Sequence, residues 1–351
     1  MKLEYKPYTL DFKFEAGTSR GSMTKRKIWI LNISEGSKNG IGEVAPLFRL
    51  SIEDEDDVID KLDHLATVDI ETPETRESAY VIAEKYAREC PSVRMGLEMA
   101  LIDFVNGSQR QWFKGDFTNG RQAIPINGLI WMGSLAEMKA QVDKKLELGF
   151  DCIKMKIGAI NWEDELKLLA YTRELSKDLI LRVDANGAFA VNKAVNKLNE
   201  LAPFDLHSIE QPILPGQPEA MQLLCSMSKV PIALDEELID KTDDQEKNDL
   251  LNDLKPQYLV LKPSLLGGFA ETQKWIRLAE QREIGWWITS ALESNIGLNA
   301  ISQFTSQFSN LGHQGLGTGQ LYHNNFHSKA KIDGQLMTYN PNSLDETLFD
   351  I

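Results

Sequence analysis

The segment that decides the fold reads Leu181-Arg182-Val183-Asp184-Ala185-Asn186-Gly187-Ala188. It predicts a short buried strand that ends near Asp184, followed by a turn at Asn186-Gly187. Alternate side chains of a strand share a face, so Asp184 points away from the face that Val183 occupies. A carboxylate at the end of an apolar strand is costly to bury unless a positive charge meets it. Asp184 is therefore the first candidate functional residue.

The same arrangement returns along the chain at a nearly constant interval. Ionisable side chains end five predicted strands, 25 to 28 residues apart, at Lys156, Asp184, Glu210, Asp235 and Lys262. Each interval has room for one strand, one helix and two loops. In a parallel barrel the carboxyl ends of the strands converge on one face, where active sites lie. The pattern predicts an α/β fold, namely a modified (β/α)7β TIM-like barrel.

The barrel is expected to occupy residues 121–330 and to follow an N-terminal α+β capping domain of residues 1–120. Alternating apolar residues in the capping domain predict two antiparallel strands joined by a polar loop, and helices follow them. The expected capping-domain elements are strands at 3–14 and 27–34, the loop at 15–25, and helices at about 75–89 and 92–106.

Strands and helices are expected to alternate through the barrel. The barrel strands are predicted near 124–130, 152–157, 180–184, 207–210, 231–235, 258–262 and 285–290, with an eighth near 315–318. A tail of about residues 330–351 contains the strand-like run 336–339 and is expected to return to the capping domain.

The composition excludes several classes of protein. The chain has 351 residues, 42% of them hydrophobic, which is ample for a large core. Its formal net charge of −14 argues against binding to nucleic acid or to an anionic membrane. The three cysteines have no metal-binding spacing, and no apolar run is long enough to span a bilayer. We expect a soluble, cytoplasmic protein, and its oligomeric state cannot be read from the sequence.

Three of the strand ends carry carboxylates, at Asp184, Glu210 and Asp235. Converging carboxylates repel one another and take up protons unless a cation lies among them. An all-oxygen set without histidine favours Mg²⁺, or Mn²⁺, over zinc. The alternative is that each carboxylate caps the following helix or pairs with a lysine, but three carboxylates at matching positions favour the metal site.

Three lysines are expected to point into the barrel. Lys154 and Lys156 share one face of their strand, while Ile153 and Met155 pack against the outer helices. Lys262 lies on the opposite side of an eight-stranded ring. Neighbouring cations and partial burial lower the pKa of a lysine, which suits a general base. The alternative is that these lysines are counter-ions of the carboxylates.

Five short segments together are similar, in order and spacing, to the muconate-lactonizing branch of the enolase superfamily. They read Lys154-Met155-Lys156, Asp184-Ala185-Asn186, Glu210-Gln211-Pro212, Asp235-Glu236 and Lys262-Pro263. The resemblance covers nearly the whole chain. Within the branch, the polar segment 290–294 resembles the o-succinylbenzoate synthases, which are dehydratases of menaquinone biosynthesis. Dipeptide epimerases of the branch usually carry an Asp-x-Asp pair at the eighth strand, whereas residues 315–319 of this chain hold no acidic pair.

The resemblance implies a reaction and a role for each residue. Enolase-superfamily enzymes abstract a proton α to a carboxylate with a lysine or histidine base and Mg²⁺. The implied metal ligands are Asp184, Glu210 and Asp235. Lys156 would remove the proton and help hydroxide to leave, and Lys262 would stabilise the enediolate. The reaction would convert 2-succinyl-6-hydroxy-2,4-cyclohexadiene-1-carboxylate, a small-molecule carboxylate, to 2-succinylbenzoate by loss of water. The residues expected to touch the substrate are Lys154, Asn186, Ser290 and Arg20, and those expected to support them are Arg182 and Glu236.

Three other functions stay open at this point. An N-acylamino acid racemase or a dipeptide epimerase of the same superfamily needs two lysines on opposite faces of its substrate, and this chain supplies both. A metal-independent lyase would use Lys262 as a Schiff-base lysine. A non-catalytic binding protein on this scaffold would have no use for two opposed lysines that point inward.

Overall fold

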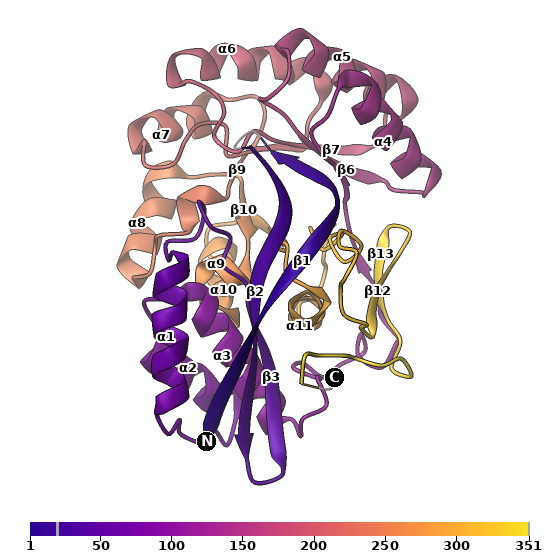
Figure 1. Cartoon of the computed structure of the whole chain (residues 1–351). Coiled ribbons are helices and arrows are strands. Elements are labelled where there is room, and N and C mark those ends of the chain that lie inside the picture. The colour runs from indigo at the N-terminus through magenta and orange to yellow at the C-terminus, as the bar shows by residue number, and fades with distance from the viewer. Residues whose placement is uncertain (19–20, 350–351) are drawn as a thin grey trace.

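The computed structural model describes residues 1–18 and 21–349 (Figure 1). Its N-terminal part is an antiparallel sheet in the order β1-β2-β3, with three helices beside it. The elements are β1 (Lys2–Thr18), β2 (Gly21–Glu35), β3 (Lys38–Val44), α1 (Glu55–Thr67), α2 (Arg76–Ala87) and α3 (Pro91–Val105).

Seven parallel strands form the barrel sheet, in the order β5-β6-β7-β8-β9-β10-β11. Residues 314 and 315 close the ring, because Gln314 bridges to Ile126 and Gly315 bridges to Thr289. They take the place of the predicted eighth strand, so the (β/α)7β prediction is confirmed. The strands are β5 (Gly128–Ile130), β6 (Cys152–Lys156), β7 (Ile180–Asp184), β8 (Ser208–Glu210), β9 (Ile232–Leu234), β10 (Tyr258–Leu261) and β11 (Gly285–Ile288).

Helices follow the barrel strands and pack outside them. Local capping fixes where several begin: Ser134 accepts the backbone N–H of Glu137 at the start of α4, and Asn161 accepts that of Glu163 at the start of α5. The helices are α4 (Leu135–Glu147), α5 (Trp162–Leu175), α6 (Val191–Leu201), α7 (Pro218–Met227), α8 (Asp244–Leu254), α9 (Pro263–Leu266), α10 (Phe269–Glu280) and α11 (Asn295–Thr305), with 3-10 turns at Ala202–Phe204 and Glu236–Leu238. No helix in the described part of the chain is long and apolar enough to cross a bilayer.

The end of the chain forms a second small sheet with the start of the barrel region. Strand β13 (Leu336–Tyr339) lies between β12 (Ala330–Asp333) and β4 (Ile124–Pro125). The tail also contacts the N-terminal sheet, because Lys6 Nζ donates to the carbonyl of Leu348 at 2.7 Å. The division into domains at residue 120 stays a prediction.

One prediction for the N-terminal part was wrong in detail. Most of the expected loop at 15–25 is extended, because β1 and β2 continue past the predicted strand ends as one long hairpin beside the barrel (Figure 1). The helix predicted at about 92–106 spans Pro91–Val105 and is buried on every side. Strand β3 packs against α3 so closely that any side chain at Gly42 would collide with the carbonyl of Gly96.

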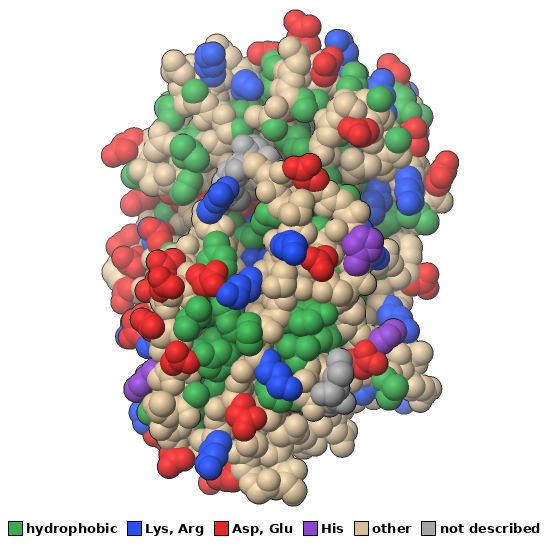
Figure 2. All heavy atoms as spheres, viewed as in Figure 1, with side chains coloured by type: hydrophobic (Ala, Val, Ile, Leu, Met, Phe, Trp, Pro, Cys, Tyr) green, Lys and Arg blue, Asp and Glu red, His purple; other side chains and the backbone are tan. Residues whose placement is uncertain are grey.

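Acidic side chains dominate part of the surface. On the face drawn in Figure 2 they gather along the side of the molecule where α1 and α8 lie. This distribution agrees with the formal net charge of −14.

Two buried glutamates of the N-terminal part bind the starts of two barrel helices. At the start of α11, Glu43 accepts hydrogen bonds from the backbone N–H of Ser294 at 2.8 Å and of Gly297 at 2.7 Å. At the start of α10, Glu98 accepts the N–H of Phe269 at 2.6 Å. A carboxyl oxygen there accepts hydrogen bonds from the free amides at the start of the helix.

A buried arginine adds a third connection. Arg26 of β2 donates to the carbonyl oxygens of Ala45 at 2.9 Å and of Ala291 at 3.0 Å, and it also contacts those of Pro46 and Leu292. It therefore holds the segment after β3 against the segment after β11.

Glu98 predicts a pH dependence of stability. Burial raises the pKa of Glu98 to about 8, although Arg94 and two backbone amides oppose the shift. The pKa of an unfolded glutamate is about 4.3, so the folded state binds the proton more tightly. This contribution to stability is full below about pH 4 and is lost as the pH rises through about 8. Glu98→Gln keeps an acceptor for the α10 amides but cannot titrate. We expect the Tm of the wild type to fall relative to this variant by a few degrees, roughly, between about pH 5 and pH 8.5.

Thermal unfolding followed by circular dichroism across this pH range measures the effect. Glu77→Gln, at an exposed position of α2, is the matched control and should follow the wild type. A Tm difference between Glu98→Gln and wild type that does not change with pH would show that Glu98 keeps one protonation state throughout.

Candidate active site

The predicted strand ends meet in register at one end of the barrel. Lys156, Asp184 and Glu210 are the last residues of β6, β7 and β8, and they are consecutive cross-strand partners. Asp235 directly follows β9, and Lys262 directly follows β10. The regular spacing in the sequence therefore becomes a row of charges across five neighbouring strands.

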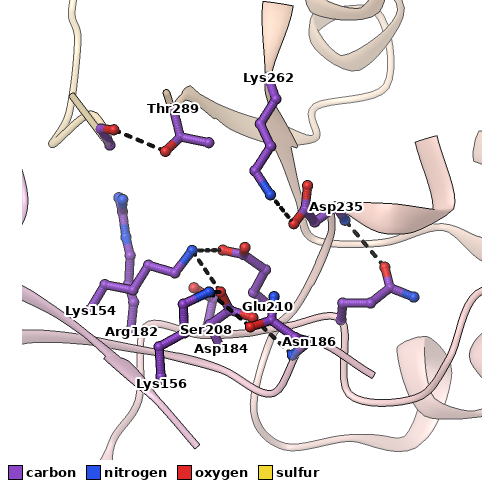
Figure 3. A network of polar contacts seen from close by, with 12 residues as sticks. Lys154, Lys156, Arg182, Asp184, Asn186, Ser208, Glu210, Asp235, Lys262 and Thr289 are labelled. Carbon is purple, nitrogen blue, oxygen red and sulfur yellow. Dashed lines mark hydrogen bonds and ion pairs between the residues drawn. The ribbon is translucent and has the colours of Figure 1, made fainter. Parts of the chain in front are cut away.

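Two lysines of β6 reach the carboxylates of β7 and β8 (Figure 3). Lys154 Nζ lies 2.6 Å from Glu210 Oε2 and 3.0 Å from Asp184 Oδ2. Lys156 Nζ lies 2.7 Å from Asp184 Oδ2 and 2.8 Å from Asn186 Oδ1. Lys154 and Lys156 both point to the inner face of the barrel, as their two-residue spacing predicts. The carboxylates of Asp184 and Glu210 meet them there.

Lys262 approaches from the other side of the site and pairs with Asp235 (Figure 3). Asn186, which adopts a left-handed backbone with φ 44°, donates from Nδ2 to Glu236 Oε1 at 3.1 Å. Asn186 therefore links Lys156 to the turn that carries Asp235.

Charges inside the barrel set the pKa values of these groups. Burial opposes ionisation of Asp184, but Lys154 and Lys156 outweigh it and hold the pKa of Asp184 well below its usual range. Burial and the neighbouring charge of Asp184 raise the pKa of Glu210 to about 8. Burial, opposed by Lys262, raises the pKa of Asp235.

The expected lowering of lysine pKa values is wrong for two of the three lysines. Burial favours the neutral form, but carboxylates outweigh it and raise the pKa of both Lys154 and Lys262. Nearby cations and burial would lower the pKa of a lysine, but the carboxylates at hydrogen-bond distance have the larger effect.

The site contains no preformed metal cluster. Within residues 1–18 and 21–349, no three carboxylate, histidine or cysteine side chains are placed as ligands of one ion. The residues nevertheless fit Mg²⁺ chemically. They offer only oxygen, and Glu210 Oε1 is buried without a hydrogen-bond partner in the described structure. The metal ligands stay a prediction.

A cavity of about 140 Å³ opens beside the lysines and is lined by both parts of the chain. Its barrel wall includes Lys154, Lys156, Asn186, Lys262, Asn127, Leu129, Trp131, Thr289, Ser290, Ala291, Leu292, Gly315, Gly317 and Thr318. Its wall from the N-terminal part consists of Gly21, Ser22, Met23, Leu47, Phe48, Arg49 and Leu50. Apolar side chains and glycines therefore surround a few charged groups, as in many small-molecule sites.

Ser290 lines the cavity, but its hydroxyl is already engaged. It donates to Glu293 Oε2 at 2.7 Å and accepts from Thr318 Oγ1 at 2.7 Å. Glu293 also accepts from Ser264, two residues after Lys262. Glu293 was not among the predicted site residues, although it is the one charged residue in the mostly small and polar segment 289–295.

The remaining predicted site residues lie elsewhere. Arg182 packs its guanidinium over the ring of Trp287, 4.0 Å from the centroid, and donates to the carbonyl of His313 at 2.9 Å. Arg182 does not line the cavity, and its supporting role stays a prediction. Arg20 lies outside the described residues, so its role stays a prediction.

Known proteins are similar to this chain in sequence and in fold. Residues 137–340 match the enolase C-terminal domain-like family, and residues 5–104 match the MenC N-terminal domain. The chain is 43% identical to o-succinylbenzoate synthase of Desulfotalea psychrophila, over 96% of this chain and 98% of that protein. It is 28% identical to N-succinylamino acid racemase of Thermus thermophilus, over 82% and 77% of the two chains.

Solved structures agree. The crystal structure of MenC from Desulfotalea psychrophila has a TM-score of 0.85 and 39% identity, covering 96% of this chain and 99% of that one. The L-Ala-D/L-Glu epimerase of Bacillus subtilis has the same fold, with a TM-score of 0.83 at 18% identity over 97% of each chain. The chain belongs to the enolase superfamily and, within it, to the o-succinylbenzoate synthase family.

Proposed function

We propose that this protein is an o-succinylbenzoate synthase of menaquinone biosynthesis. It would remove water from 2-succinyl-6-hydroxy-2,4-cyclohexadiene-1-carboxylate and release 2-succinylbenzoate. The observation that carries the proposal is the pair of lysines on opposite sides of one cavity, Lys156 and Lys262, beside three buried carboxylates. The 43% identity to o-succinylbenzoate synthase of Desulfotalea psychrophila, over 96% of this chain, supports the same reaction. Three free, buried cysteines suit the reducing cytoplasm.

Lys156 is the proposed base. Its ammonium has two oxygen partners, Asp184 Oδ2 and Asn186 Oδ1, which fix the direction of its side chain toward the cavity. After taking the proton α to the substrate carboxylate, Lys156 returns it to the departing hydroxyl on the same face. Apolar walls at Leu129, Trp131 and Leu292 would limit the access of water to this proton.

Lys262 is proposed to act through its charge. Because Asp235, Glu210 and Glu236 raise its pKa, it stays protonated near neutral pH and favours the negative charge that develops on the substrate. The same raised pKa argues against a Schiff-base lyase, since that chemistry requires a neutral amine.

Asp184, Glu210 and Asp235 are the residues that would hold Mg²⁺, with Mn²⁺ as a possible substitute. When bound, the ion would bind the substrate carboxylate and lower the cost of the negative charge that forms next to it. Formally, the three carboxylates balance Lys154, Lys156 and Lys262. A divalent ion would add positive charge to this set, which suits a substrate that carries carboxylates.

A racemase acting on N-acylamino acids is the second candidate function. The specific observation in its favour is the same pair of opposed lysines, because racemisation requires a base on each face of the α carbon. In the dehydration, Lys156 alone exchanges protons with the substrate. The two functions therefore differ in what they require of Lys262.

Removing one proposed metal ligand tests the metal site. We expect Asp184→Asn, Glu210→Gln and Asp235→Asn each to lower the rate at least about a thousandfold, because charge stabilisation at the reacting carboxylate is lost. Loss of the cyclohexadiene absorbance measures the rate, with circular dichroism to check the fold. Asp164→Asn, at the surface of α5, is the control and should keep full activity. Full activity of the wild type after EDTA treatment would exclude an essential metal.

Arginine substitutions test the division of work between the lysines. Arginine keeps the positive charge but does not act as a base near neutral pH. We expect Lys262→Arg to keep measurable dehydration, reduced about a hundredfold by its bulk and planar geometry, and Lys156→Arg to have none. Stopped-flow absorbance measures both variants.

Deuterium exchange separates the synthase from the racemase. In the dehydration, solvent deuterium should enter an unreacted substrate analogue only when Lys156 is present. If each single lysine variant instead exchanges the α proton of one enantiomer of an N-acylamino acid at a measurable rate, both lysines act as bases. The protein would then be assigned as a racemase.

A further inference from the structure

We infer that Gln211 is a positioning residue of the proposed metal site: its side chain fixes the place of Asp235 relative to Glu210. The inference rests on the proposed assignment of these two carboxylates as metal ligands. Gln211 follows Glu210 in the sequence, and it is fully buried outside the cavity wall. It therefore acts through its neighbours and not by touching substrate.

The amide of Gln211 bridges the ends of two ligand-bearing strands. Its Oε1 accepts the backbone N–H groups of Asp235 and Glu237, each at 3.3 Å. Its Nε2 donates to the carbonyl of Ile213 at 3.0 Å and to Glu237 Oε2 at 3.1 Å. The side chain that leaves the end of β8 thus holds the first turn after β9, where Asp235 lies.

The orientation of this amide follows from its partners. Two backbone N–H donors face the oxygen, and two acceptors face the nitrogen. A flipped amide would place its NH2 group against both N–H groups and its oxygen against a carboxylate. All its partners are satisfied in one arrangement only, so the amide sets the separation of the two strand ends.

The backbone of Gln211 supplies an independent observation. Its φ is 40°, in the left-handed region that glycine and asparagine adopt far more readily than glutamine. Asparagine would suit this backbone better, but its side chain is one methylene shorter and cannot span to the turn at Asp235. The choice of glutamine in an unfavourable backbone conformation is explained by the reach of its side chain.

The bridge continues beyond Asp235. The other carboxylate oxygen of Glu237 accepts the N–H of Gly216 at 2.9 Å, so the turn after β9 is tied at two points to the segment after β8. Loss of the Gln211 side chain would leave the N–H groups of Asp235 and Glu237 without partners. The turn would then move to satisfy them, and Asp235 with it.

Metal binding by the substrate-free protein tests this role. The probe is Mn²⁺, followed by electron paramagnetic resonance of the free ion, with Mg²⁺ as competitor. We expect Gln211→Asn and Gln211→Met to weaken Mn²⁺ binding about 10- to 100-fold, as loss of a group that orients a ligand does. The Tm of Gln211→Asn should fall only slightly, since the easier left-handed backbone of asparagine offsets part of the cost of the unpaired N–H groups. Gln217→Met, which removes a side-chain hydrogen bond to the carbonyl of Leu214 from the same loop, should bind Mn²⁺ as the wild type does.

Each outcome decides between a positioning role and a structural one. Mn²⁺ binding by Gln211→Asn as tight as that of the wild type would overturn the inference. A Gln211→Asn protein that no longer folds would also overturn it, because the residue would then serve the fold alone. If the wild type and Asp235→Asn bind Mn²⁺ equally, the assignment of Asp235 as a metal ligand is wrong. That result contradicts the proposed metal site, and it is distinct from a failure of the role inferred for Gln211.

Discussion

The burial of three carboxylates at the ends of neighbouring strands is the constraint on which the site and its surroundings depend. No one of these charges is tolerated inside the barrel without an opposite charge at hydrogen-bond distance. Asp184 meets Lys154 and Lys156, and Asp235 meets Lys262. A shift of β6 by one residue would turn both its lysines toward the outer helices and leave Asp184 buried and unpaired. The ion pairs of the site therefore require the observed register of the sheet.

Most of the barrel could be predicted from the sequence, because each strand and helix is specified by residues close together in the chain. A strand of about five residues and a helix of about 12 each carry their own periodicity, and their caps mark the boundaries. The strand predicted at 180–184 agrees with β7 at both ends. The convergence of Lys156, Asp184 and Glu210 was predictable too, because parallel strands with right-handed connections allow only one face for their carboxyl ends.

What could not be predicted depends on contacts between distant parts of the chain. The pKa of Lys154 rises because Glu210 and Asp184 lie within reach of it, and no pattern within one strand reveals that balance. In the sequence, nothing distinguishes Glu43 and Glu98 from other polar residues. Only the packed structure places them at the starts of α11 and α10. The role inferred for Gln211 is of the same kind, since its partners lie 24 and 26 residues further along the chain.

The connections made by Glu43 and Arg26 bear on how such enzymes diverge. Most of their contacts are to backbone atoms in the segments around Ala291 and Ser294, although Glu43 also accepts a hydrogen bond from the Ser294 hydroxyl. Point mutations in the substrate pocket that keep this backbone in place leave these backbone contacts intact. An insertion after β11 would displace the carbonyls and amides and break the junction. Recombination between relatives is consequently restricted to breakpoints that keep the β11–α11 segment together with the sheet that binds it.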